Sequence, residues 1–107
     1  MSDLNWDKSF ANEQAGEDSE LLAELLGLLC ESSKSDLRKI KDGLAAGDSQ
    51  AVFEAAHSIK GAAASLGVEG LREEAYHLEK MGRESRLEAI DLAAISELVG
   101  KLETLRA

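Results

Sequence analysis

Apolar residues recur at steps of three and four along most of this 107-residue chain. One stretch of this apolar stripe reads Val52, Ala55, Ile59, Ala62 and Leu66. Such spacing is typical of the face of an α-helix that packs on a core. The chain has no proline and only 4% aromatic residues, so little interrupts long helices and little favours strands. The pattern predicts an all-α fold.

Capping residues divide the pattern into five helical segments. We expect a short helix over residues 4–10, a polar loop over 12–18, and longer helices over 19–46, 49–66 and 69–82, with a last helix that starts at a Ser85-x-x-Glu88 capping box. Gly67 should end its helix with a left-handed backbone. Four long helices with short links indicate an antiparallel four-helix bundle, in which the short N-terminal helix caps one end. We expect a single domain over residues 1–107.

The predicted core continues this periodicity in the other helices. Its members are Leu22, Leu25, Leu29, Leu37, Ile40, Leu44, Leu71, Ala75, Leu78, Met81, Ile95, Leu98, Leu102 and Leu105. The stripe lapses at Ser32-Ser33, which leaves a bend or a brief break open at that point. Trp6 and Phe10 are expected to cover one end of the core.

His57 lies on the side of its helix opposite the apolar stripe. At about 100° per residue, Phe53, Lys60, Gly61 and Ala64 share its outward face. Glycine within a helix costs roughly 1 kcal/mol against alanine. Gly61 is either merely tolerated, or it lets a neighbouring helix or an outside molecule approach closely. We favour the outside molecule, because Ala64 on the same face is also small.

The motif His57-x-x-Lys60-Gly61, followed six residues later by Gly67, resembles the core motif of histidine-containing phosphotransfer (HPt) domains of two-component phosphorelays. The likeness extends to positions that the family often shares: Ala56, Leu66, Leu71, Leu78 and Glu79. It covers nearly the whole chain in length and helix pattern.

The resemblance implies that His57 is phosphorylated by the phosphoaspartate of a receiver domain and then passes the phosphoryl group on. A neutral imidazole nitrogen is a competent nucleophile near pH 7. Lys60, one turn away, would stabilise the charge on the oxygens of the transferring group. Gly61 and Ala64 would leave steric access for the partner.

Three further residues are candidates for docking or for imidazole support. Phe53 is a candidate for docking because it lies on the same outward face as His57. The alternative is a partly buried aromatic residue at the edge of the bundle. Glu79 occupies the position at which the family usually has a polar residue that contacts the histidine. It would accept a hydrogen bond from the other imidazole nitrogen, with an ordinary solvated glutamate as the alternative. Arg83, one turn later, is a candidate for phosphate contact.

The sequence lacks the motifs of several kinds of enzyme. There is no P-loop, no kinase signature and no aspartate cluster for Mg²⁺, so we expect a phosphocarrier without its own ATP-dependent kinase activity. We expect no metal and no cofactor. In the family, Mg²⁺ belongs to the partner receiver domain.

The formal net charge of −9 argues against binding to nucleic acid. The single cysteine, Cys30, has no partner for an internal disulfide, and no signal-peptide or membrane-spanning pattern is present. We therefore expect a cytoplasmic protein. The resemblance implies a monomer whose partners are response-regulator receiver domains and, with them, a hybrid sensor histidine kinase. The receiver, the direction of transfer, and the choice between a free-standing shuttle and a domain of a hybrid or chemotaxis kinase stay open.

Two rival interpretations use the same helices. Glu54-x-x-His57 and Glu74-x-x-His77 match the paired Glu-x-x-His motifs of di-iron bundles. A ligand in a bundle core must point inward, however, whereas His57 faces outward. His77 is assigned no role. A helical interaction module without chemistry is the second rival, and it leaves the combination of His57, Lys60 and Gly61 to coincidence.

Overall fold

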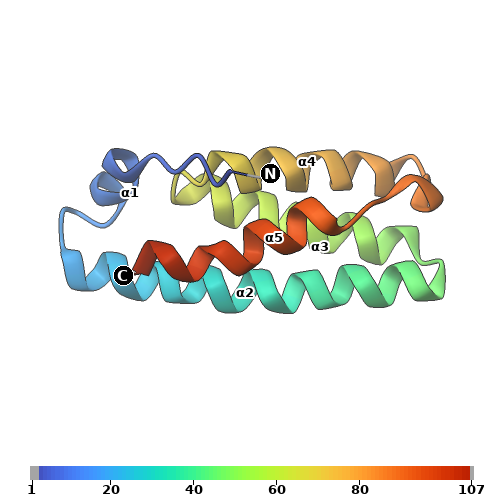
Figure 1. The fold of residues 1–107 in the computed structure, drawn as a ribbon, viewed down its shortest axis with the longest axis horizontal. Helices are drawn as coiled ribbons and strands as arrows, with labels where there is room; N and C mark the ends of the chain where they lie inside the picture. The colour runs from blue at the N-terminus through green and yellow to red at the C-terminus, as the bar shows by residue number, and fades with distance from the viewer. Residues whose placement is uncertain (1–2, 107) are drawn as a thin grey trace.

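The computed structural model describes residues 3–106, and its ordered elements in this range are helices. They are α1 (Lys8–Gln14), α2 (Ser19–Ala46), α3 (Ser49–Ser65), α4 (Glu69–Arg83), η1 (Leu87–Ala89), α5 (Ala93–Lys101) and η2 (Leu102–Arg106). From α2 to α5, successive helices run in opposite directions along the long axis of the molecule (Figure 1). The predicted all-α fold and antiparallel bundle are confirmed.

The ends of α2 follow from local capping. The carboxylate of Asp18 accepts hydrogen bonds from the backbone N–H groups of Glu20 and Leu21, and Gly47 ends the helix with φ 67°. The helix continues through Ser32-Ser33 without a break. The helix packs on the core both before and after this pair, and this packing keeps α2 continuous through the two serines.

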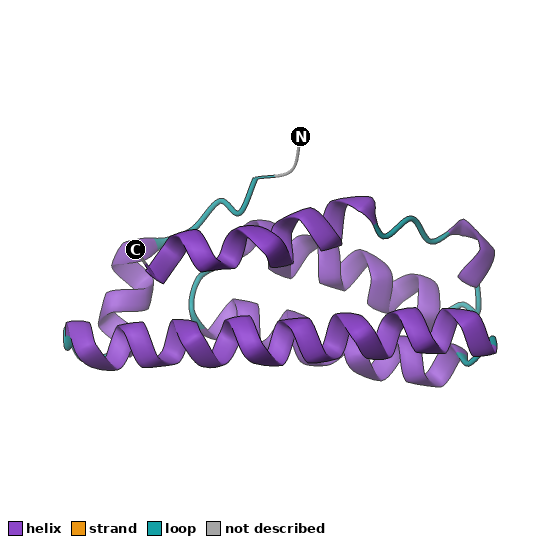
Figure 2. Ribbon diagram, turned by 60° about the horizontal axis from the view of Figure 1, so that its bottom comes forward, coloured by secondary structure: helices purple, strands orange, loops and turns teal. Residues whose placement is uncertain are grey.

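Gly67 ends α3 as predicted, with φ 70°. The N–H of Val68 donates to the carbonyl of Ala63 (2.9 Å), and the N–H of Gly67 donates to that of Ala64 (3.3 Å). This pair of bonds is a Schellman motif, which satisfies the last carbonyls of the helix. The motif turns the chain sharply into α4, so that α3 and α4 lie side by side (Figures 1 and 2).

The N-terminal prediction was wrong in its boundaries. The helix begins at Lys8 rather than at residue 4, and it runs to Gln14, into the expected loop. Residues 3–7 instead form no helix and lie beside the α3–α4 turn, where the N–H of Asp7 donates to the carbonyl of Gly67 (2.9 Å). The carboxylate of Asp7 then accepts from the N–H of Phe10 and caps α1. These long-range bonds outweigh the local helical spacing.

Trp6 covers one end of the core, as expected. It is half-buried against the core cluster, and its indole Nε1 donates to the carbonyl of Leu66 at 3.0 Å. Phe10, by contrast, is exposed at 36%. The N-terminal segment with α1 therefore closes the end of the bundle at which α3 turns into α4.

The prediction that a Ser85-x-x-Glu88 capping box starts the last helix is also wrong. Ser85 has φ 55°, whereas an N-cap residue needs an extended backbone. Residues 84–92 form a connection that includes η1 (Figure 2). The last helix begins only at Ala93, whose N–H donates to the carboxylate of Asp91 at 2.9 Å.

The predicted core is buried except at four positions. Those four, outside α3, are half-buried at the edge of the core: Leu25, Leu44, Met81 and Leu105. On the apolar stripe of α3, Ala62 is likewise half-buried. Leu26 and Cys30 are buried between the predicted positions of α2, because η2 and α1 cover a wider part of this helix than one stripe. Among the described residues, no helix combines the length and the apolar character needed to cross a membrane.

Candidate functional site

His57 lies at the middle of α3 with 61% of its side chain exposed. Its neighbours Ala56 and Ile59 are fully buried, and they anchor the helix on the core with the histidine facing out. The predicted outward orientation of the imidazole is confirmed. A ring in this place is accessible to a partner molecule.

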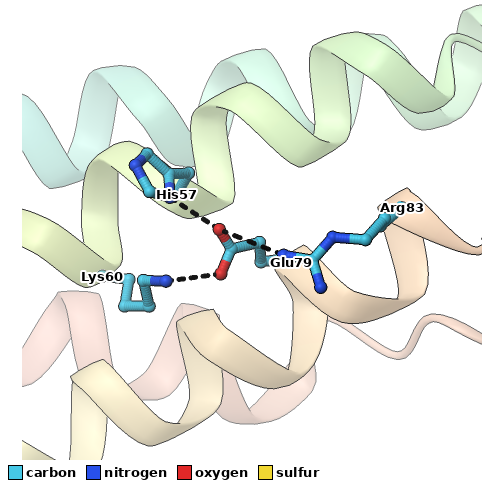
Figure 3. Close-up of polar contacts among 4 residues, drawn as sticks. All are labelled: His57, Lys60, Glu79 and Arg83. Carbon is cyan, nitrogen blue, oxygen red and sulfur yellow. Dashed lines mark hydrogen bonds and ion pairs between the residues drawn. The ribbon is translucent and has the colours of Figure 1, made fainter.

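Glu79 of α4 joins His57 and Lys60 through one carboxylate (Figure 3). Its Oε2 lies 2.6 Å from Nδ1 of His57, and its Oε1 accepts from Nζ of Lys60 at 2.7 Å. The side chain of Glu79 is 1% exposed, against 27% for Lys60. Glu79 is therefore a buried acceptor with a partner for each oxygen, and the solvated alternative is wrong.

The environment of Glu79 keeps its carboxyl group ionised. Burial by itself raises the pKa of Glu79, but the hydrogen bonds from Lys60 and His57 outweigh burial and leave this pKa below its ordinary value. An ionised carboxylate can only accept hydrogen bonds. The short contact with His57 consequently requires a proton on Nδ1.

This contact distinguishes the two nitrogens of the ring. Nδ1 points to Glu79, and in the neutral imidazole a proton on Nδ1 leaves the lone pair on Nε2. Nε2 is the nitrogen that Glu79 does not engage, on an exposed ring. Chemically, the arrangement presents Nε2 as a nucleophile.

Phe53 and Arg83 flank the ring. The rings of Phe53 and His57 stack with centroids 6.1 Å apart, and the guanidinium of Arg83 lies 5.5 Å from the centroid of Phe53. Arg83 also approaches Oε2 of Glu79 at 3.9 Å. Phe53 is half-buried at the edge of the bundle, which is the alternative predicted for it from the sequence. From this position its ring stacks on the imidazole. Arg83 thus supplies a second cation beside the imidazole.

Gly61 and Ala64 leave the approach to His57 open. A Cβ added at Gly61 would meet nothing within 4 Å, so this glycine does not serve the close approach of a neighbouring helix. Ala64 is half-buried on the same face. This open space fits the expected approach of an outside molecule to His57.

Three features of the site were missed in the sequence. Tyr76 is exposed, and its ring centroid lies 5.5 Å from Nζ of Lys60. Its spacing of three residues from Glu79 is the signal that would have placed it on this face of α4. Gly82 brings α4 against α3, because an added Cβ there would lie 2.9 Å from the backbone nitrogen of Phe53.

The third missed feature is a hydrogen bond on the other side of α3. Oγ of Ser58 donates to Oδ2 of Asp36 in α2 at 2.7 Å. Both residues read as ordinary polar positions in the sequence. Their meeting depends on how α2 and α3 pack.

The paired Glu-x-x-His motifs do not converge. Glu54, His57 and His77 are exposed rather than directed into the core. Within residues 3–106, no three or more His, Cys, Asp or Glu side chains form a group suited to a metal ion. The ligand arrangement of a di-iron bundle is therefore not formed by these residues.

Comparison with known proteins agrees with this geometry. The crystal structure of histidine-containing phosphotransfer protein B (HptB) from Pseudomonas aeruginosa PAO1 matches with a TM-score of 0.70 and 24% sequence identity, over 95% of this chain and 84% of that one. At this identity the likeness supports the fold. No curated protein sequence gives a significant match. The model of the family described as the Hpt domain matches residues 24–107, and the chain belongs to this family of histidine-containing phosphotransfer domains.

Proposed function

We propose that the chain is a phosphorelay intermediate, in which Nε2 of His57 takes a phosphoryl group from the phosphoaspartate of a receiver domain and passes it on. The observation that carries the proposal is the 2.6 Å contact between Nδ1 of His57 and Glu79. It commits one nitrogen to a buried carboxylate and leaves the other as a nucleophile on an exposed ring.

Transfer from the aspartate to Nε2 needs no further reactant. The lone pair of Nε2 attacks phosphorus, the P–O bond to the aspartate breaks, and its electron pair leaves with the aspartate carboxylate. The proton on Nδ1 stays in place. The phosphorylated ring therefore becomes an imidazolium, and the carboxylate of Glu79 lies beside the new positive charge. The reverse step returns the group to an aspartate.

Lys60 supports the transferring group by its charge. Its ammonium lies 2.7 Å from Oε1 of Glu79 and is partly exposed, so the flexible side chain can also extend to phosphoryl oxygens one turn away. Transfer requires little covalent chemistry from the protein beyond position and charge. Gly61 and Ala64 give the receiver in-line access.

The partner supplies what the chain lacks. The receiver domain brings Mg²⁺ together with its phosphoaspartate, and a hybrid sensor histidine kinase is a source of such a receiver. The chain itself acts as a monomeric carrier in the cytoplasm, without using ATP. Phe53 and Arg83, beside the ring, belong to the surface that meets the receiver.

The test is transfer from a ³²P-labelled receiver domain to the purified chain. We expect label that is lost in acid and retained in base, which is typical of phosphohistidine, and no label on His57→Gln. The matched control is His77→Gln, which removes the other histidine and should keep the label. Failure of the wild type to take label from a panel of phosphorylated receivers would overturn the proposal.

A further inference from the structure

Asp36 is a buried carboxylate at the packing of α2 on α3. It lies near the middle of α2 and is 7% exposed. Its Oδ2 accepts from Oγ of Ser58 at 2.7 Å, while Nζ of the exposed Lys39 remains 3.9 Å from Oδ1. Burial of a carboxylate is unfavourable unless its hydrogen bonds are made. The directional bond to Ser58 is therefore the feature that an apolar residue would not reproduce.

Ser58 is the residue next to His57, so α3 is tied on both sides of the histidine. Ser58 bonds to Asp36 of α2, whereas His57 and Lys60 bond to Glu79 of α4. At about 100° per residue, Ser58 and Lys60 lie on opposite flanks of His57. A rotation of α3 about its axis lengthens the bond on one flank or the other.

Such a rotation matters at the imidazole. At a side-chain radius of about 6 Å, a turn of about 10° moves a group by about 1 Å. A misplacement of about 1 Å is enough to cost on the order of 100-fold in rate when reacting atoms must be aligned. The ties to α2 and α4 together hold the ring against this motion.

We propose that Asp36 is a positioning residue for phosphotransfer, which acts through Ser58 to fix the rotation of α3 and thereby the direction of the His57 ring. The inference rests on the proposed function of His57. Asp36 does not touch the reacting atoms. Its effect reaches them through the backbone of two adjacent residues.

The first test separates positioning from stability. In Asp36→Leu the free energy of unfolding should change little, because the lost hydrogen bond and the added burial of apolar surface are of similar size and opposite sign. The single-turnover rate constant for transfer from a phosphorylated receiver should nevertheless fall about tenfold, with KM for the receiver unchanged. Ser58→Ala should reproduce the loss, and Ser58→Thr, which keeps the hydroxyl, should restore transfer. Ser65→Ala is the matched control, since its hydroxyl bonds only to the Ala62 carbonyl of its own helix.

The second test needs no receiver. Nitrogen-15 NMR of the His57 ring should show the proton on Nδ1 in the wild type and a smaller Nδ1–H population in Asp36→Leu and Ser58→Ala. Wild-type rates and an unchanged tautomer in both variants would overturn the positioning role, and so would lower stability with unchanged rates. If the wild type takes no label, the proposed function fails, while the tautomer populations still decide the positioning.

Discussion

Glu79 reaches across the α3–α4 interface to His57, with 2.6 Å between Oε2 and Nδ1, from a position with almost no exposure to solvent. The same carboxylate holds Lys60 through its other oxygen. One buried group thus orients both the proposed nucleophile and its supporting cation. The chemistry of the site depends on α4 as much as on the motif in α3.

Replacement of Glu79 should slow phosphotransfer. A hydrogen bond to a charged group contributes about 1.5–3 kcal/mol, so we expect Glu79→Ala to lower the transfer rate constant about 10- to 100-fold. Glu79→Gln should lose less, because its carbonyl can still accept from Nδ1. Single-turnover kinetics with a phosphorylated receiver measures both. Equal rates in all three proteins would contradict the role of Glu79.

The ionisation of Glu79 should make the free energy of unfolding depend on pH in the acid range. Its pKa in the folded protein is lowered from the ordinary value of 4.5, so the unfolded chain binds the proton more readily. The carboxylate therefore stabilises the fold above pH 4.5, and this contribution is lost as the pH falls through the lowered pKa. Urea unfolding from pH 7 downward should show the free energy of unfolding of wild type falling relative to that of Glu79→Gln below about pH 4.5. A difference that is constant across this window would contradict the ion-pair assignment.

Lys60→Ala should slow transfer while the fold stays intact. The variant removes the cation proposed to support the phosphoryl oxygens, and we expect a loss of about tenfold in rate or a shorter phosphohistidine lifetime. Circular dichroism should be unchanged. Lys80→Ala, which removes an exposed lysine from α4, is the control. Unchanged rates in both directions for Lys60→Ala would remove its role.

Gly61→Gln should separate activity from stability. Glutamine is the better helix former by up to about 1 kcal/mol, and an added Cβ meets nothing within 4 Å, so the melting temperature should hold or rise. Transfer should be blocked, because the side chain fills the approach to Nε2. Gly100→Gln on α5 is the matched control, since an added Cβ there also meets nothing within 4 Å. Full transfer by Gly61→Gln would show that clearance at this position is unnecessary.

Gly82→Ala should have the opposite effect on stability. The added Cβ would lie 2.9 Å from the backbone nitrogen of Phe53, which forces α3 and α4 apart. We expect destabilisation of about 1–3 kcal/mol, measured by urea unfolding, together with slower transfer because Glu79 moves away from the ring. Gly100→Ala should not destabilise the protein. Stability of Gly82→Ala equal to that of wild type would show that the helices adjust without strain.

Local signals account for most of the elements. The N-caps Asp18 and Asp48 and the left-handed Gly47 and Gly67 mark the ends of α2 and α3, which lie within one residue of the expected ranges 19–46 and 49–66. At the N-terminus, the apolar spacing predicted a helix from residue 4, but hydrogen bonds to residues far along the chain prevent it. Asp7 begins α1 late because the preceding residues pair with the α3–α4 turn.

The sequence by itself determined the helical class, the bundle, and the outward face of His57 with Lys60 and Gly61, because helical periodicity and capping act within a few residues. Only the tertiary structure decided that Glu79 is buried against His57 and that Asp36 meets Ser58. Each of these two pairs joins residues 22 positions apart on different helices. Buried and solvated carboxylates look alike in a sequence, and the packing of helices on both sides of α3 makes the difference.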